Sequence, residues 1–290
     1  MRFKLLVLGA SGMAGHTIAL YMKEQGHDVL GFDNRPVNHC ESITGDAKNS
    51  EELKNLISNE KFDAVINCIG ILNQFAEQKK ELAVLLNAYL PHVLADVTSG
   101  TRTKVIHMST DCVFSGTRGE YTEADFPDGK TFYDRSKALG ELDDEKNITL
   151  RTSIVGPDLN PNGIGLLNWF MCLPMDSKIS GYQKVLWTGV TTLQLAKAME
   201  AALQEDVHGL YNMVYKDPIS KYDLLLLFNK YMRGSRLLIA PFDGIVSNKS
   251  LKRTRFDFGY LIPDYEKMIS DLATWMKKYE RFYPHYNFFG

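Results

Sequence analysis

The first fifteen residues constrain the fold more than any other part of the chain. An apolar run at residues 3–8 is followed directly by a glycine-punctuated loop at 9–15 (GASGMAG), which opens an amphipathic stretch. Gly9 permits a tight turn after a strand, and Gly12 lets the backbone approach a ligand closely. Gly15 allows the following helix to press against the sheet. The order of strand, turn and helix therefore predicts an α/β unit with a parallel sheet.

The same alternation of apolar runs and helical periods continues downstream. We predict strands near residues 3–9, 28–33, 63–68, 104–109 and 148–154. We predict helices near 12–25, 49–59, 79–99 and 131–146, and a further short strand at Ile43. Repeated strand–helix alternation with apolar strands indicates a doubly wound parallel sheet with helices on both faces.

The pattern of apolar strands and helices stops after residue 155, where the turn-rich stretch GPDLNPNG occupies residues 156–163. We therefore predict a sheet domain at 1–155, to which 188–215 return with a helix near 191–204 and a strand near 209–215. Residues 156–187 and 216–290 are expected to build a smaller lobe with helices near 220–232 and 264–278. An aromatic tail is expected to pack against the body, through Phe282, Tyr283, Tyr286, Phe288 and Phe289.

Composition excludes several classes of protein. The 33 basic and 35 acidic residues give a formal net charge of -2, and no basic run suggests nucleic acid or a charged membrane as a partner. The N-terminus enters a short strand, so neither a signal peptide nor a membrane span fits, and a cytoplasmic protein is expected. The four cysteines are scattered and the histidines lack metal-ligand spacing, so neither a disulfide framework nor a metal site is expected.

The glycine loop also predicts a dinucleotide site. A second apolar run ends at Asp33, roughly 20 residues past the loop, where an acidic residue contacts the ribose of a bound dinucleotide. The N–H groups at the start of the helix would face the phosphates. The spacing is G-x-x-G-x-x-G rather than G-x-G-x-x-G, and the alternative is a glycine-rich turn that binds nothing.

A second group of residues points to ketone chemistry. Tyr133 and Lys137 are four residues apart, so on a helix an ammonium can stand beside a phenol and favour its ionised form. Ser109, Thr110 and Asp111 end another apolar run, and ligands of parallel sheets bind at the carboxyl ends of strands. Adjacent strand residues point to opposite faces, so only one of Ser109 and Thr110 can aim at the site. Together with the glycine loop, these residues predict nucleotide-dependent ketone chemistry.

These motifs resemble those of the extended short-chain dehydrogenase/reductases. Within that superfamily they are similar to the dTDP-4-dehydrorhamnose reductase family and related reductases of 4-keto-6-deoxy sugar nucleotides, over about the first 155 residues. The shared segments are the glycine loop, Gly45-Asp46, 63–67 (DAVIN), Leu86-Asn87, 109–114 (STDCVF), 120–123 (EYTE), the Tyr133–Lys137 motif and 150–153 (LRTS). The family usually has Tyr at Cys112 and an aromatic residue near Ile154, so the resemblance implies a reaction class rather than a particular sugar.

The resemblance implies a Rossmann-type doubly wound sheet with a smaller α/β substrate lobe, and hydride transfer from NADH or NADPH to a ketone. Tyr133 would be the proton donor, and Lys137 would assist it. Substrate contacts are expected from Thr110, Asp111 and Tyr133. Cofactor contacts are expected from Gly9, Ser11, Gly12, Met13, Gly15, Asp33, Arg35, Asp46, Ala47, Cys68, Ile69, Gly70, Tyr133 and Lys137.

Two residues favour different cofactors. Asp33 would repel a 2′-phosphate and favour NADH, while Arg35 could pair with that phosphate. We therefore predict dual use with a slight lean to NADH. Asn87 could join a proton relay or cap a backbone group, and Cys68 is interpreted as a small apolar wall.

Three functions remain open at this stage. The first is a reductase of a nucleotide-linked 4-keto-6-deoxy sugar in deoxysugar or surface polysaccharide biosynthesis. The second is an epimerase or dehydratase acting on a nucleotide sugar. The third is a regulatory subunit that binds a dinucleotide without turnover. A homodimer is compatible with all three.

Overall fold

This computed structural model describes residues 1–288. A parallel sheet of seven strands lies at the centre of their fold. The strand order is β11-β6-β5-β4-β1-β2-β3, and every neighbouring pair is parallel. The strands are β1 (Lys4–Leu8), β2 (Asp28–Asp33), β3 (Glu41–Thr44), β4 (Ala64–Asn67), β5 (Lys104–Ser109), β6 (Ile148–Arg151) and β11 (Gly209–Asn212). Strand order reverses between β1 and β4, and the carboxyl ends of these strands are where ligands of such sheets bind. The prediction of a doubly wound parallel sheet is confirmed.

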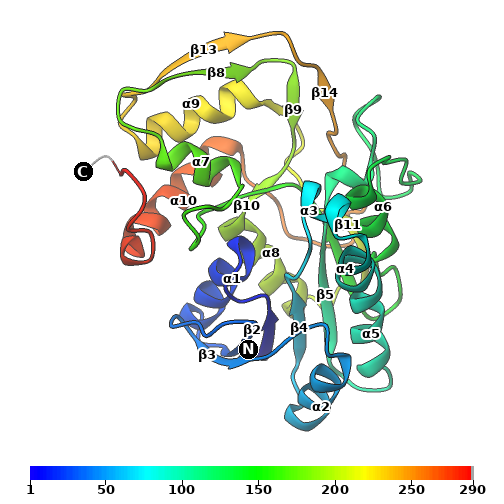
Figure 1. Cartoon of the computed structure of the whole chain (residues 1–290). Coiled ribbons are helices and arrows are strands. Elements are labelled where there is room, and N and C mark those ends of the chain that lie inside the picture. The colour runs from blue at the N-terminus through cyan, green and yellow to red at the C-terminus, as the bar shows by residue number, and fades with distance from the viewer. Residues whose placement is uncertain (289–290) are drawn as a thin grey trace.

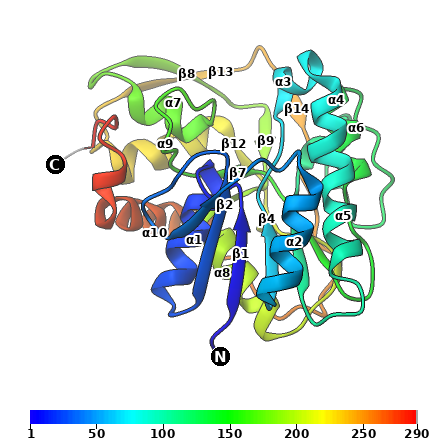
Figure 2. The same ribbon diagram turned by 60° about the horizontal axis from the view of Figure 1, so that its bottom comes forward.

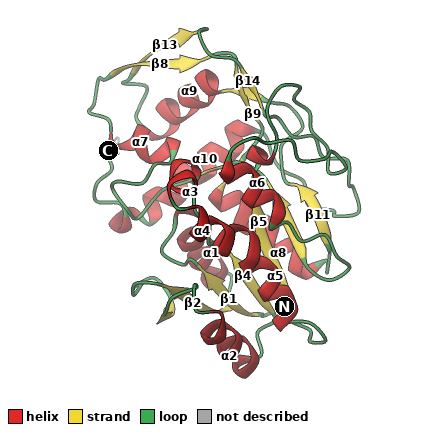
Figure 3. Cartoon of the chain, turned by 45° about the vertical axis from the view of Figure 1, so that its right-hand side comes forward, coloured by secondary structure: helices red, strands yellow, loops and turns green. Residues whose placement is uncertain are grey.

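Helices cover both faces of the sheet because the side chains of each strand alternate (Figures 1 and 2). Leu5 and Val7 of β1 belong to the core shared with the helices α1 and α8, whereas Leu6 and Leu8 belong to the core on the α2 and α5 side. The helices of the first layer are α1 (Met13–Glu24) and α8 (Thr192–Gln204). Those of the second layer are α2 (Ser50–Glu60), α3 (Asn73–Gln78), α4 (Lys80–Ala83), a π-helix (Val84–Tyr89), α5 (Leu90–Val97) and α6 (Phe132–Leu139). Figure 3 shows strands enclosed between these helices.

A smaller lobe lies beyond the carboxyl edge of the sheet (Figure 1). Its strands pair in twos and threes: β13 with β8, and β9 with both β12 and β14. Its elements are α7 (Leu166–Cys172), β8 (Lys178–Tyr182), β9 (Val185–Trp187), β12 (Ile219–Ser220), α9 (Lys221–Met232), β13 (Leu238–Phe242) and β14 (Ser247–Asn248). The parallel pair β7 (Ile154–Val155) and β10 (Val190–Thr191) lies where the chain passes between the sheet and this lobe.

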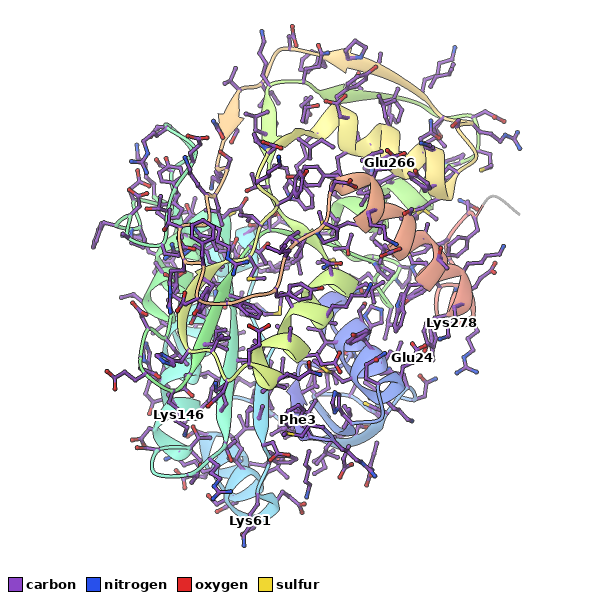
Figure 4. All side chains as sticks on the ribbon, turned by 180° about the vertical axis from the view of Figure 1, so that it is seen from behind. Phe3, Glu24, Lys61, Lys146, Glu266 and Lys278 are labelled. Atoms are coloured by element: carbon purple, nitrogen blue, oxygen red, sulfur yellow. The ribbon has the colours of Figure 1, made fainter. Side chains whose placement is uncertain are left out.

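The C-terminal segment joins the smaller lobe to the sheet domain. Helix α10 (Tyr265–Lys278) packs against both α9 and α8, and a short 3₁₀ turn (Glu280–Phe282) follows it. Lys278 forms an ion pair with Glu24 at the end of α1 (Figure 4). The predicted aromatic tail packs inward, with Tyr283 fully buried, while Phe289 lies outside the described residues. The exact lobe boundaries at 155, 187 and 216 stay a prediction.

Two predicted elements differ from the structure. The helix predicted at 131–146 ends at Leu139 with Gly140 as its C-cap. A Cβ on Gly140 would lie 1.9 Å from the Asn87 carbonyl oxygen of the π-helix, so a side chain does not fit there. The helix predicted at 79–99 is instead α4, the π-helix and α5 in succession. Among the described helices, none combines the length and apolar character that a membrane crossing needs.

Candidate functional site

The glycine loop forms the tight turn between β1 and α1. Gly9 has a positive φ of 76°, and its N–H donates to the Phe32 carbonyl oxygen at 2.9 Å. A Cβ on Gly9 would lie 3.1 Å from Cγ1 of Ile69, so the loop directly contacts the segment after β4. A Cβ on Gly15 would lie 2.1 Å from the Gly9 carbonyl oxygen, which leaves no room for a side chain. The turn and close helix packing predicted for Gly9 and Gly15 are therefore confirmed.

Ser11, Asp33 and Arg35 meet beside this turn. The Ser11 N–H donates to Oδ2 of Asp33 at 2.8 Å, and Nε of Arg35 donates to the Ser11 hydroxyl at 3.2 Å. Ser11 and Arg35 line a cavity of about 410 Å³ together with Pro36, Val37, Asn38, His39, Leu159 and Asn160. The turn, the acidic residue at the end of β2 and the adjoining cavity fit the adenosine end of a dinucleotide.

The remaining predicted cofactor residues surround the same edge of the sheet. The Gly45 N–H donates to the Asp33 carbonyl oxygen at 2.9 Å, which brings the loop containing Asp46 and Ala47 beside β2. Asp46 is exposed and pairs with Lys48 at 3.0 Å, while Ala47 packs against the α2-side core.

Met13 and the segment after β4 complete this edge. Met13, the first residue of α1, is half-buried, and a Cβ on Gly165 would lie 3.1 Å from its sulfur. Cys68 and Ile69 are half-buried beside Gly9, and Gly70 is exposed. Burial raises the pKa of Cys68 to about 12, so its thiol is neutral, as an apolar wall requires.

Thr110 and Ser109 point in different directions at the end of β5. The Ser109 hydroxyl donates to Oε1 of Glu141 at 2.6 Å, away from the site. Thr110 instead caps a short 3₁₀ turn (Asp111–Val113), because its Oγ1 accepts a hydrogen bond from the Cys112 N–H at 3.1 Å. The Thr110 hydroxyl donates to Oδ1 of Asp111 at 3.2 Å, and it lies close enough to the Tyr133 phenol to lower the pKa of that group. Thr110 is therefore the residue of this pair that reaches Tyr133.

Helix α6 begins with a complete capping box that fixes the position of Tyr133. Oγ1 of Thr131 accepts from the Asp134 N–H at 3.1 Å, and Oδ2 of Asp134 accepts from the Thr131 N–H at 3.1 Å. Tyr133 follows in the first turn and is 8% exposed. Burial is the largest influence and raises the pKa of Tyr133 above its ordinary range. The neighbouring Cys112 adds to this increase, and Thr110 opposes it. The phenol is thus neutral and able to donate a proton.

Lys137 lies one turn further along α6, deep beneath Tyr133. It is 5% exposed, and its Nζ donates to the Met108 carbonyl oxygen at 2.6 Å. Burial is the largest influence on the pKa of Lys137 and lowers it to about 8. The expected lowering of the Tyr133 pKa by the Lys137 ammonium is not observed, because burial is the largest influence on both groups and Lys137 is not among the groups that shift the pKa of Tyr133.

Asn87 uses its whole amide to hold two parts of the site together. Its Oδ1 accepts from the Ile71 N–H at 2.8 Å, and its Nδ2 donates to the Ile71 carbonyl oxygen at 2.9 Å and to the Ser136 hydroxyl at 3.0 Å. Of the two roles open from the sequence, backbone capping is the one observed. Asn87 ties the segment after β4 to the helix that carries Tyr133.

Two lysines that the sequence did not single out also reach the site. Lys221, the first residue of α9, lies over the Trp187 ring at 5.2 Å, and its positive charge acts on Asp111 together with that of Lys249. Burial raises the pKa of Asp111 and lowers that of Lys221 to about 8, and each of these groups opposes the shift of the other. No local motif marks Lys221, because only the packing of the smaller lobe brings it to the sheet.

The arrangement can bind a dinucleotide along the glycine turn and place a polar substrate between the lobes. At the carboxyl ends of β4 and β5 lie a neutral phenol, a hydroxyl that lowers its pKa and a buried lysine. From the smaller lobe, Lys221 interacts with Asp111 and Cys112 beside them. Such a set suits proton donation to an oxygen that gains negative charge.

Comparison with known proteins agrees with this geometry. A dTDP-4-dehydrorhamnose reductase of Salmonella typhimurium is 29% identical over 296 residues, which cover 94% of this chain and 97% of that protein. A probable low-salt glycan biosynthesis reductase, Agl14, of Haloferax volcanii is 35% identical over 139 residues, 47% of this chain and 46% of that protein. The matches to the first curated relatives thus span only about half the length of those proteins.

The fold is shared with solved structures. A dTDP-4-dehydrorhamnose reductase from Bacillus anthracis, in complex with NADP, superposes with a TM-score of 0.78 at 18% identity, covering 94% of this chain and 99% of that one. A family model described as the RmlD substrate binding domain matches residues 3–255. Since that match spans most of the 290 residues, the chain belongs to the RmlD substrate binding domain family.

Proposed function

We propose that this protein is an NAD(P)H-dependent reductase of a nucleotide-linked 4-keto-6-deoxy sugar, acting in deoxysugar and surface polysaccharide biosynthesis. The observation that carries the proposal is the buried Tyr133 phenol, whose pKa burial raises and Thr110 lowers, at the sheet edge that also holds the glycine turn. The names of the full-length relatives, dTDP-4-dehydrorhamnose reductases, support the same reaction.

The proposed mechanism assigns one task to each residue. A bound nicotinamide supplies hydride to the ketone carbon. Thr110 donates a hydrogen bond to the ketone oxygen and holds it within reach of Tyr133. Tyr133 donates its proton as negative charge develops on that oxygen, a contribution typically worth about 10²–10⁴ in rate. Lys137 then returns a proton to the phenolate.

For cofactor choice we infer that both NADH and NADPH are used. The Asp33 carboxylate accepts from the Ser11 N–H, and Arg35 lies against the hydroxyl of the same serine, so either ribose group meets a partner there. The slight lean to NADH that Asp33 predicts finds no support in the Bacillus anthracis structure, which was solved with NADP. Arg35→Ala is expected to reduce kcat/KM for NADPH selectively, and Asp33→Ala to reduce it for NADH. Equal ratios in wild type and Asp33→Ala would show that this carboxylate does not contact the ribose.

The decisive experiment incubates the protein with a panel of dTDP- and UDP-linked 4-keto-6-deoxy sugars and reduced cofactor. The proposal expects cofactor oxidation matched one to one by a new deoxysugar nucleotide. An isomeric product without net cofactor oxidation would instead identify an epimerase. Dinucleotide binding with no turnover of any substrate would favour the regulatory reading, and one relative, the beta subunit of methionine adenosyltransferase 2 from Xenopus laevis, gives reason to include that outcome.

A further inference from the structure

A chain of buried polar side chains runs beneath the site and ends on Lys137. It consists of Asn67 at the end of β4, His107 in β5 and Lys137 in α6, which we call the Asn67–His107–Lys137 chain. Asn67 and His107 are fully buried, and Lys137 is 5% exposed. Buried polar groups need hydrogen-bond partners, so the donors and acceptors along this chain must match.

The backbone fixes the orientation of the first member. The Ile69 N–H donates to Oδ1 of Asn67 at 3.1 Å, which requires the amide oxygen on that side. Nδ2 of Asn67 therefore faces Nδ1 of His107 at 3.2 Å. An amide nitrogen donates only, so Nδ1 of His107 must accept.

The orientation of Asn67 in turn fixes the tautomer of His107. Burial holds the pKa of His107 well below its ordinary range, so the ring is neutral. A neutral imidazole carries one proton, and with Nδ1 accepting, that proton lies on Nε2. Nε2 lies 3.3 Å from Nζ of Lys137.

The Nε2–H group thus points at the lysine nitrogen. An ammonium has three donors and no lone pair, whereas a neutral amine has a lone pair that can accept. Nζ of Lys137 also donates to the Met108 carbonyl oxygen at 2.6 Å, a bond that either form can make. The contact with His107 is therefore satisfied only when Lys137 is neutral.

We propose that His107 is a positioning residue that stabilises the neutral amine of Lys137 through its Nε2–H donor and so prepares Lys137 to release a proton toward Tyr133. This inference rests on the proposed reductase function for its use in turnover. In the step, the Tyr133 O–H breaks as the product hydroxyl forms. A Lys137 N–H bond then breaks as the Tyr133 O–H re-forms, and the resulting amine later takes a proton from solvent.

Other charged groups near Lys137 do not reverse this preference. Glu141 favours the ammonium, but its two oxygens accept from Nε and Nη2 of Arg151 at 2.8 and 2.7 Å. Cys68 also favours the ammonium, but its thiol is kept neutral by burial. His92 lowers the pKa of His107 further, which keeps that ring neutral. Burial lowers the pKa of Lys137 in the same direction as the His107 donor.

The first test needs no substrate and uses the wild-type protein. In ¹⁵N-histidine-labelled protein, NMR should show His107 as the neutral Nε2–H tautomer at neutral pH, with its signals identified by their loss in His107→Leu. An Nδ1–H tautomer or a doubly protonated ring would overturn the proposal, whether or not the protein proves to be a reductase.

The second test measures Lys137 itself. In ¹⁵N-lysine-labelled protein, His107→Leu should raise the Lys137 pKa by about one unit, the size expected for losing one hydrogen bond to the neutral form. His107→Gln retains an N–H donor and should stay near the wild-type value. The exposed His208 is the matched control, and His208→Leu should change nothing.

The pH profile separates this inference from the proposed function. In the pH profile of kcat, the pKa that reflects Lys137 should shift in His107→Leu by the same amount as the Lys137 pKa measured by NMR. In His107→Gln, both values should stay near those of the wild type. An unmoved Lys137 pKa in folded His107→Leu, or an equal shift in His107→Gln, would refute the role of His107. Absence of turnover in wild type would refute the reductase proposal while leaving the NMR result standing.

Discussion

The sheet domain and the smaller lobe contribute to the site in different ways. In the sheet domain, the groups stand where local backbone rules place them: a glycine turn after β1, Thr110 after β5 and Tyr133 in the first turn of a capped helix. The smaller lobe supplies Lys221, the first residue of α9, whose positive charge acts on Asp111 at the end of β5.

This difference indicates which region carries out the reaction and which region selects the substrate. Residues fixed by the parallel sheet are held rigidly and suit the reaction common to a family. Residues on the second lobe depend on how that lobe packs and suit the recognition of a particular substrate. Changes in the sheet domain should therefore affect stability and rate most, and changes in the smaller lobe should affect substrate binding.

The largest effect is expected from the buried ion pair of the sheet domain. Arg151 and Glu141 form two hydrogen bonds with side chains 2% and 7% exposed, and the same carboxylate accepts from Ser109. Glu141→Ala leaves a buried guanidinium unpaired, so unfolding free energy should fall by about 3–5 kcal/mol. Chemical denaturation followed by circular dichroism measures this.

The surface pair Lys230–Glu266 of the smaller lobe and α10 is the control, with both side chains more than half exposed. Glu266→Ala should cost no more than about 1 kcal/mol. If Glu141→Ala and Glu266→Ala lowered the unfolding free energy equally, the sheet domain would not be held more rigidly than the smaller lobe.

Tyr133→Phe is expected to give the next largest effect. It removes the proposed proton donor while preserving the ring, so kcat should fall by about 100-fold or more. Dinucleotide affinity should change little, which isothermal titration calorimetry would check. Tyr89→Phe, at an exposed tyrosine, should leave both quantities unchanged. A Tyr133→Phe variant that keeps more than about a tenth of the wild-type rate would exclude Tyr133 as the acid.

Lys221→Met tests the contribution of the smaller lobe. Loss of one charge-assisted contact to a bound substrate should lower kcat/KM by about 10- to 100-fold, mostly through KM, with dinucleotide affinity unchanged. Lys230→Met on the same helix, at an exposed lysine, should have no effect. A change in kcat alone would place Lys221 with the reacting groups and break the division between the two regions.

The sequence predicted the sheet domain because its signals are local. A glycine turn and apolar runs of strand length each depend on residues close together in the chain. Helix α6 shows the limit of this reasoning. The sequence predicted a helix past Leu139, but the helix ends there at Gly140, which contacts Asn87 of the π-helix, 53 residues earlier in the chain.

The sequence could not predict the parts of the site that depend on packing. His107 was interpreted as a surface or core histidine, and its contact with Lys137 exists only because β5 and α6 lie together. In the smaller lobe, β8 and β13 are paired strands with largely half-buried or exposed residues, so they carried no strong apolar pattern. The cofactor and catalytic roles assigned from the sequence stay predictions until the variants are measured.

The smallest expected effect concerns the tail that connects the two regions. Nδ1 of His16 lies 2.8 Å from the Gly12 carbonyl oxygen and donates to it, so Nε2 accepts from the buried Tyr283 hydroxyl at 3.0 Å. Burial lowers the pKa of His16 to about 4, which keeps the ring neutral and preserves this arrangement. The bond fastens the C-terminal segment to the first turn of α1, next to the glycine loop.

Tyr283→Phe should therefore lower unfolding free energy by about 1 kcal/mol, since the Thr17 hydroxyl, 3.4 Å from Nε2, can replace only part of the lost bond. Tyr279→Phe is the control, because its hydroxyl bonds Glu24 in an exposed position and should cost less. Because the tail holds the start of α1, Tyr283→Phe should also weaken dinucleotide binding slightly, whereas Tyr279→Phe should not. Equal dinucleotide affinities in the two variants would mean that the sheet domain alone holds the glycine loop. The C-terminal tail would then contribute to stability but not to dinucleotide binding, and the two regions would differ more clearly in their roles.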